Sequence, residues 1–463
     1  MSQRLNFSVD FGNAADSKTG KNDHDAQLTF VVLGNFNRDQ DAQRQPGESN
    51  ITLHKTDLDN FESLLSRMNP TLEIDLAGVS KPLHLSFKTL DDFHPDQLYQ
   101  QLSMLDLEPP PIEHTSQTNQ DQRSPESSES DQQTLSRLLG DGALSTAPGN
   151  RPAARGKSAL IESVVGRLVN DSLLSDSQEN SDRNQEKPDS HQGIAKLLRT
   201  LLHHPAFQAL ESRWRGLDWL LRNIESEEVD GVYLLNLGDA AWNSYTRQDL
   251  DITQTELFGA LQQRFCDQGS SAQKLLLICD KQIAPSSEGI TLLHHLGQLA
   301  ESLDAHLIAG ADACFISADE SNSDDLVAWN SIKDSLPGKR ISLVLPRVLL
   351  RLPYGAQYDP VDAFDFEELD QQWSASDLLW GCPAYALAII LAAYHRPNSQ
   401  TAIPSLTDCP AFAYSEEGEA RLQPCTEHIF LEKELNGILQ LGLVPLIGSR
   451  RTNIVKLPWQ PQL

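Results

Sequence analysis

The sequence has few basic residues for its number of acidic ones. Lys and Arg total 37 and Asp and Glu total 65 in 463 residues, so the formal net charge is −28. A chain with this charge is repelled by phosphate backbones and by anionic membrane surfaces. We therefore expect no nucleic-acid partner.

Long hydrophobic runs and an export signal are also lacking. No stretch reaches the ~18 consecutive apolar residues that a membrane span needs. The first residues, MSQRLNFSVDF, do not combine a basic segment with a following apolar one. These features predict a cytoplasmic protein without membrane insertion.

The six cysteines are too few and too scattered for a disulfide framework or a zinc site. None forms a CxxC pair, and Cys279 in LLLICD and Cys314 in ADACF have apolar neighbours. This usage predicts free thiols.

Catalytic motifs are missing as well. The sequence contains no GxxxxGK[ST], no GxGxxG after a strand, no GxSxG and no HExxH. His203 and His204 are adjacent, and neighbours on a helix point about 100° apart, so a shared metal is disfavoured. We expect no cofactor, no metal and no enzymatic activity.

One acidic cluster offers a remote alternative, a metal-dependent hydrolase. Its carboxylates could hold a hard cation or act as an acid–base pair. The cluster is interleaved with Phe364 and Phe366, which favours a solvated loop that docks through these two rings. Its members are Asp359, Asp362, Asp365, Glu367 and Glu368.

Residues 1–107 have the patterns of a small α/β unit. Residues 4–11 alternate with Leu5, Phe7 and Val9 on one side, which predicts a half-buried strand. Further strands are expected at 28–33 and 83–87. Between them, residues 57–68 predict an amphipathic helix closed by Pro70.

Residues 108–192 are mostly polar. Tracts such as PPPIEHTSQTNQDQRSPESSES hold too little apolar surface to offset the entropy of ordering. We expect a mostly disordered linker with short helices at 134–140 and 158–170.

Residues 193–463 predict a larger α/β domain. A helical pattern runs from 194 to 224, with Phe207 and Trp214 on its buried face, and Pro205 within it marks a restart or a kink. Apolar strands and helices then alternate, which favours a mainly parallel or mixed sheet flanked by helices. The expected strands are 232–237, 274–279, 305–309 and 341–345, and the expected helices are 254–266 and 289–303.

Arg347 and Arg351 lie four residues apart in VLPRVLLRLPYG. At helical spacing they could bind an anionic ligand. In the simpler interpretation they pair with the nearby carboxylates, within the chain or across a subunit boundary.

Several of these segments resemble the large subunit of the type VI secretion contractile sheath. They are LLHHPAFQALESRWRGLDWLL (201–221), LPRVLLRLPYGAQYDPVDAFDFEE (345–368), WGCPAYALAIILAA (380–393) and FLEKELNGILQLGLVPLIGSRRTNIV (430–455). The positions carried by the first two segments are His203, His204, Pro205, Phe207, Leu210, Glu211, Trp214, Arg215, Gly216, Leu217, Pro346, Arg347, Arg351, Leu352, Pro353, Tyr354, Gly355, Phe364, Phe366 and Glu367.

The N-terminal part resembles the small sheath subunit, normally a separate chain. The similar segments are RLNF (4–7), FVVLGNF (30–36), DLDNF (57–61) and FKTLDDFHPDQL (87–98). The chain is therefore similar to a fusion of both subunits.

The resemblance implies a structural component that joins or caps a contractile lattice by strand exchange and helix packing. The strand with Leu5, Phe7 and Val9 is then an exchange arm or an ordinary strand of its own domain. The implied partners are sheath subunits or further copies of this chain, baseplate or inner-tube components, and a disassembly ATPase.

Two departures from the family pattern are expected to matter. The chain ends at Leu463, before the family's C-terminal region, and PPPIEHTSQ stands where the small subunit carries C-terminal helices. The short helices at 134–140 and 158–170 replace those helices or correspond to the N-terminal helices of the large subunit, where the ATPase binds. An accessory or assembly regulator that does not polymerise is the alternative function.

Overall fold

The computed structural model describes most of the chain outside the N-terminus and the polar segment. The described residues are 27–37, 51–76, 79, 81–104, 188–224, 229–267, 273–317, 324–370, 372–395, 404–416 and 419–458. The predicted strand at 4–11 and the short helices predicted at 134–140 and 158–170 lie outside these residues. No helix of the described part is both long and apolar enough to cross a membrane.

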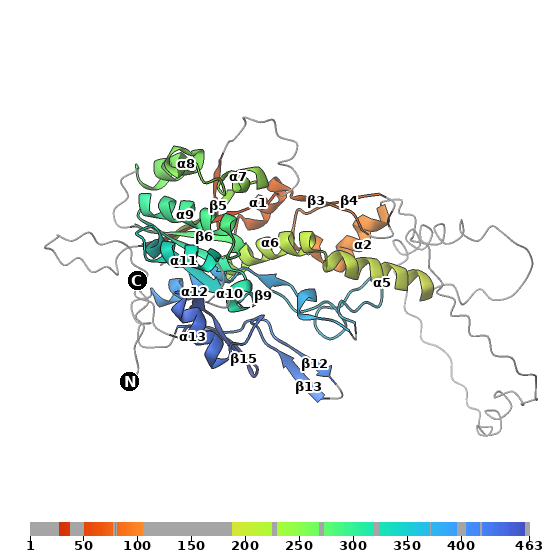
Figure 1. The fold of residues 1–463 in the computed structure, drawn as a ribbon. Helices are drawn as coiled ribbons and strands as arrows, with labels where there is room; N and C mark the ends of the chain where they lie inside the picture. Colours follow the sequence, from red (N-terminus) through yellow and green to blue (C-terminus); the bar gives the residue numbers. More distant parts are fainter. Residues whose placement is uncertain are drawn as a thin grey trace, which may run out of the picture.

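A seven-stranded sheet forms the centre of the molecule, in the order β14-β8-β7-β6-β1-β5-β2 (Figure 1). All neighbouring strands are parallel except β2, which runs antiparallel to β5 at one edge. The strands are β1 (Gln27–Gly34), β2 (Leu53–Thr56), β5 (Val229–Asn236), β6 (Gln273–Ile283), β7 (Ala305–Ala311), β8 (Ile341–Leu345) and β14 (Val444–Pro445).

The strands are buried on both faces, because their side chains alternate between two cores. In β1, Phe30 and Val32 belong to one core, whereas Val31 and Leu33 belong to the other. The continuous apolar runs of the sequence therefore correspond to strands covered on both sides. The predicted α/β fold with a mainly parallel sheet flanked by helices is confirmed.

The first core lies between the sheet and a layer that includes α6 and α12. It also takes in the N-terminal elements and several C-terminal strand residues. Its elements are α1 (Phe61–Met68), β3 (Thr71–Ile74), β4 (Leu83–Ser86), the 3₁₀ turn Leu90–Phe93, α2 (Pro95–Met104), α5 (Pro188–Leu202), α6 (Pro205–Asn223) and α12 (Pro383–Tyr394).

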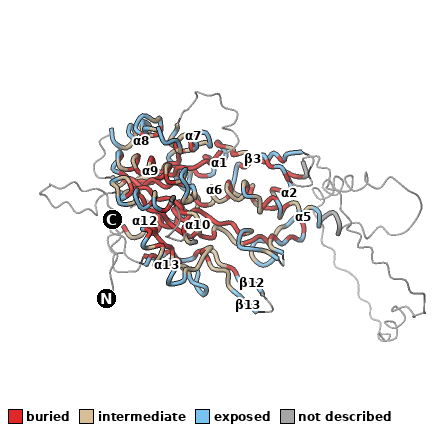
Figure 2. Tube along the Cα trace, viewed as in Figure 1, coloured by how far each residue is buried: buried red, intermediate tan, exposed pale blue. Residues whose placement is uncertain are grey.

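The second core lies on the opposite face of the sheet. Figure 2 shows the buried residues concentrated along the strands and the inner sides of these helices. The elements are α7 (Asp239–Ser244), the 3₁₀ turn Ile252–Gln254, α8 (Glu256–Phe265), α9 (Ser287–Ser302), α10 (Cys314–Ser317), α11 (Asp324–Lys333), the 3₁₀ turn Gly338–Arg340 and α13 (Glu432–Gln440).

Small strand pairs complete the C-terminal part. β9 pairs with β10, β12 pairs with β13 in a hairpin that projects from the body, and β11, β16 and β15 form a three-stranded sheet (Figure 1). The elements of this part are β9 (Val348–Leu349), the 3₁₀ turn Ala375–Asp377, β10 (Trp380–Gly381), β11 (Ser405–Leu406), β12 (Phe412–Glu416), β13 (Glu419–Gln423), β15 (Ile447–Ser449) and β16 (Thr452–Lys456).

Two predicted helix boundaries differ in the structure. Helix α1 begins at Phe61 rather than at 57, because Asp57 and Asn60 accept hydrogen bonds from each other's backbone N–H and hold a turn. The long predicted helix is two helices, α5 and α6, and Pro205 is the first residue of the second. Proline suits that position because the N–H it lacks has no partner there.

The N-terminal part contributes to the same sheet as the rest of the chain. Strand β1 is hydrogen-bonded to β5 on one side and to β6 on the other. The division at 107 and 193 stays a prediction about sequence segments, because the described parts on both sides share one sheet and one core.

Candidate functional site

Helix α6 carries eight of the predicted residues. The side chain of His204 caps its first turn by accepting from the N–H of Ala206 at 3.2 Å. Phe207, Leu210, Trp214 and Leu217 recur at three- and four-residue steps and have no exposed surface. The predicted burial of Phe207 and Trp214 is confirmed.

Trp214 joins α6 to the N-terminal part of the chain. Its indole Nε1–H donates to the backbone oxygen of Phe36 at 3.1 Å. Its ring also meets the rings of Phe36 and Phe61 edge to face, at centroid distances of 5.1 and 5.9 Å. The indole thus has both the apolar contacts and the polar partner that a buried tryptophan needs.

Gly216 marks the closest approach between α6 and α12. A Cβ atom added there would lie 2.6 Å from Cε2 of Tyr385. The Tyr385 hydroxyl donates to Asp280 at 3.1 Å, which restrains the ring beside Gly216. The sequence patterns did not single out Asp280 or Tyr385. The one signal was that Asp280 directly follows the apolar run LLLIC.

A buried network of charged side chains lies beside α6. Glu211 accepts hydrogen bonds from Arg215 Nε at 2.7 Å and from Arg351 Nε at 2.8 Å. Arg351 also donates to Glu368 at 2.7 Å, and its guanidinium carbon lies 4.0 Å from the centre of the Tyr354 ring. Two carboxylates and two guanidinium groups therefore balance each other within the protein.

The network keeps its groups charged. Burial favours the neutral form of Glu211, but Arg351 and Arg215 outweigh it, so the pKa of Glu211 lies below its usual value. Burial likewise favours deprotonation of Arg351, but Glu211 and Glu368 overcome it and hold its pKa well above the usual value. Each of these charged groups is hydrogen-bonded to another member of the network, so the network holds α6 and the 347–370 segment together.

The predicted pairing with the nearby acidic cluster is confirmed for Arg351 and wrong for Arg347. Arg351 pairs with Glu368 of the acidic cluster and with Glu211 of α6. Arg347 instead binds Glu427, with Nε 2.7 Å from Oε2. The expected helical spacing is absent, because strand β9 begins directly after Arg347 and pairs with β10.

The acidic cluster is a loop held by its aromatic residues, as predicted. Phe364 and Phe366 are buried, whereas Asp362, Asp365 and Glu367 are exposed. Glu368 is the exception, because it is buried in the network. Among the described residues, no group of three or more His, Cys, Asp or Glu side chains could hold a metal ion.

Two further contacts attach this loop. The carboxylate of Asp96 in α2 accepts from the backbone N–H groups of Asp362 and Ala363, at 3.1 and 2.9 Å. His203 lies between two carboxylates, 3.9 Å from Glu368 and 3.7 Å from Asp377. His203 and His204 therefore have separate structural roles.

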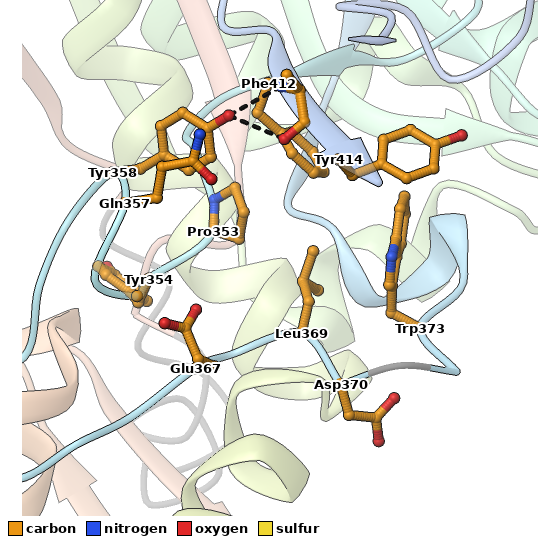
Figure 3. A pocket seen from close by; sticks show the side chains of 12 residues that line it. Pro353, Tyr354, Gln357, Tyr358, Glu367, Leu369, Asp370, Trp373, Phe412 and Tyr414 are labelled. Atoms are coloured by element: carbon orange, nitrogen blue, oxygen red, sulfur yellow. Dashed lines mark hydrogen bonds between the residues drawn. The ribbon is translucent and has the colours of Figure 1, made fainter. Parts of the chain in front are cut away.

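The remaining predicted residues of the described part lie along the segment after β8. Pro346 follows a cis peptide bond, and Leu352 packs against a small hydrophobic cluster. Pro353, Gly355 and Glu367 line a surface hollow of about 180 Å³ (Figure 3). Leu5, Phe7 and Val9 are outside the described residues, so their role as an exchange arm stays a prediction.

Comparison with known proteins gives this fold and site a family. The EvpB/VC_A0108 tail sheath N-terminal domain matches residues 190–457, and the type VI secretion system family described as VipA, VC_A0107 or Hcp2 matches residues 14–107. The first match covers more than half of the chain. The chain belongs to the type VI secretion tail sheath family.

A curated relative supports this assignment. The type VI secretion system sheath protein TssC1 of Pseudomonas aeruginosa is 30% identical over 279 residues, which make up 55% of this chain and 56% of TssC1. The chain thus spans about half the length of this relative.

Proposed function

We propose that the chain is a structural component of a type VI secretion contractile sheath, which joins or caps the lattice by strand exchange and helix packing. One observation carries the proposal. Segments that match two sheath families lie on one polypeptide, and β1 of the first lies between β5 and β6 of the second. The combination corresponds to a sheath building block.

The packing of the chain suits a part that transmits force. Strand β1 is hydrogen-bonded along both edges, and its residues from Leu28 to Leu33 have no exposed surface. The buried network of Glu211, Arg351 and Glu368 ties α6 to the segment after β9. A contractile lattice stores energy in alternative packings of subunits, which requires subunits that keep their shape.

The proposal includes partners and location. The partners are sheath subunits or further copies of the chain, together with baseplate or inner-tube components and a disassembly ATPase. The location is the cytoplasm. No chemical step is assigned to the protein.

Isolation of sheath particles tests the proposal. Particles from the source cells are collected by ultracentrifugation, the chain is quantified by mass spectrometry, and the same fraction is imaged by electron microscopy. We expect recovery in tubules at a fixed ratio to other sheath subunits. Absence from tubules, with recovery in small complexes, would overturn the proposal in favour of an accessory regulator.

A further inference from the structure

The surface hollow beside the projecting hairpin is lined by aromatic rings. Leu369 and Phe412 lie between Tyr358, on one side, and Trp373 with Tyr414, on the other (Figure 3). Trp373 meets Tyr414 edge to face at a centroid distance of 5.0 Å. The Tyr358 hydroxyl donates to the backbone oxygen of Ala413 and accepts from its N–H, at 3.0 and 2.8 Å. Contacts within the chain therefore hold the side chains on both sides of the hollow in place.

The acidic residues of the hollow favour a cationic partner. Glu367 and Asp370 lie on the same side of the hollow as Leu369, and both are exposed (Figure 3). Within the described part of the chain, their carboxylates accept from the backbone N–H groups of Ala356 and Gln372 and make no ion pair. The faces of aromatic rings add further negative potential. A guanidinium or ammonium group fits this combination and an anion does not.

A complementary feature lies at the tip of the β15–β16 hairpin. Arg450 and Arg451 are adjacent there, and both are exposed. Neither makes an ion pair with any carboxylate among the described residues, although the chain carries a net charge of −28. Two adjacent arginines that have no ion pair within the described part of so acidic a protein suit an acidic surface on another molecule.

We propose that the aromatic hollow of one copy of the chain receives the Arg450–Arg451 tip of a second copy. Neither arginine of the tip lines the hollow of its own chain, so the proposed contact joins two molecules. The two surfaces differ, so a bound pair of copies still has one free hollow and one free tip, and the contact can repeat along a series. The inference rests on the proposed function, for which it supplies one subunit contact.

Cysteine crosslinking of two differently tagged copies tests the contact. Gln357→Cys places a thiol at the hollow of one copy, and Thr452→Cys places a thiol at the tip of the other, without altering either charged group. Both copies carry Cys266→Ser and Cys314→Ser, because these two native cysteines are exposed. With diamide as oxidant, two thiols lose their protons and two electrons and form one disulfide. We expect a crosslinked heterodimer that a reductant separates.

Two controls decide the outcome. Gln262→Cys, on the exposed side of α8, replaces Gln357→Cys as the matched control and should give no more than background crosslinking. Arg450→Glu with Arg451→Glu should lower the heterodimer yield about tenfold, which corresponds to the loss of one good charged contact. Circular dichroism of each variant verifies that it is folded.

Equal yields from Gln357→Cys and Gln262→Cys would overturn the inference, as would a yield that survives the charge reversal. The measurement uses the purified chain alone. It can therefore fail while the chain is still recovered in sheath particles, and the two proposals fail separately.

Discussion

Glu211 in α6 and Arg351 beyond β9 are 140 positions apart in the sequence, yet Arg351 Nε lies 2.8 Å from Glu211 Oε1. The Glu211 side chain has no exposed surface and that of Arg351 is 9% exposed. A buried ion pair adds little over an apolar pair of the same size, but removal of one partner leaves an uncompensated charge. The pair therefore makes α6 and the 347–370 segment depend on each other.

Arg351→Met should lower the free energy of unfolding by about 3–5 kcal/mol, because it leaves the buried Glu368 without its guanidinium partner and Glu211 with Arg215 alone. Glu211→Gln should be harmful for the same reason, and the double variant should lose less than the sum of the two. Urea denaturation measures all three. As a control, Arg222→Ala removes an exposed pair with Asp218 within α6 and should cost about 0.5 kcal/mol or less. Equal losses for Arg351→Met and Arg222→Ala would contradict the interpretation.

Trp214 gives a second test of α6. Trp214→Ala should destabilise the chain by about 3–5 kcal/mol, because it removes a fully buried indole from between Phe36 and Phe61. Trp219→Ala, at a partly buried position of the same helix, should cost clearly less. Thermal melts of both variants make the comparison, and a wild-type melt of Trp214→Ala would show that α6 is not central to the core.

Regular patterns were enough to predict most of the fold. The apolar runs at 28–33, 274–279 and 341–345 became β1, β6 and β8, because strands buried on both faces must be apolar at every position. Helix α6 followed from its three- and four-residue spacing. In each case the information is local, within one turn or one strand.

Such local patterns could not predict which strands or side chains pair when they are far apart in the sequence. The place of β1 between β5 and β6 depends on residues about 200 positions away, and no periodicity encodes which strands are neighbours. The same applies to Arg347, whose partner Glu427 lies outside the acidic cluster that seemed nearest in the sequence. Glu368 differs from Glu367 only by one position, but that position points inward.

Gly216→Ala tests the close approach of α6 and α12. The new methyl group would lie 2.6 Å from the Tyr385 ring, whose hydroxyl is held by Asp280, so we expect a loss of about 1–3 kcal/mol in the free energy of unfolding. Gly259→Ala in α8 is the matched control, since nothing lies within 4 Å of its Cβ. That variant should gain about 0.5–1 kcal/mol from higher helix propensity. Stabilisation by both substitutions would rule out the tight contact.

Cleavage of the chain between α2 and α5 should leave its two parts associated. Cleavage at a protease site inserted between Gln120 and Asp121 breaks the covalent link between β1 and the strands β5 and β6. The hydrogen bonds between these strands and the shared core are left in place. After cleavage, we expect both fragments in one peak of a native size-exclusion column. In urea above the unfolding midpoint the same sample should give two species. Separation under native conditions would contradict the shared sheet.

The pH dependence of stability should report on His306. This side chain in β7 is fully buried, with Nε2 2.7 Å from the Ser342 hydroxyl. Burial, with a smaller contribution from Arg340, lowers its pKa to about 3. In the unfolded chain the pKa is about 6.5, so between these values the unfolded state binds the proton more strongly.

Stability should therefore fall as the pH drops below about 6.5, by about 1.4 kcal/mol for each pH unit from this residue alone, until the folded protein itself protonates near pH 3. His306→Gln removes the titrating group, so its loss between pH 7.5 and 5.5 should be smaller than that of the wild type, even if it is less stable at pH 7.5. Urea midpoints across this range give the comparison. His84→Gln, at a side chain that is 68% exposed, is the control for the removal of an exposed imidazole. Parallel profiles for His306→Gln and the wild type would mean that this buried imidazole does not determine the acid sensitivity of the fold.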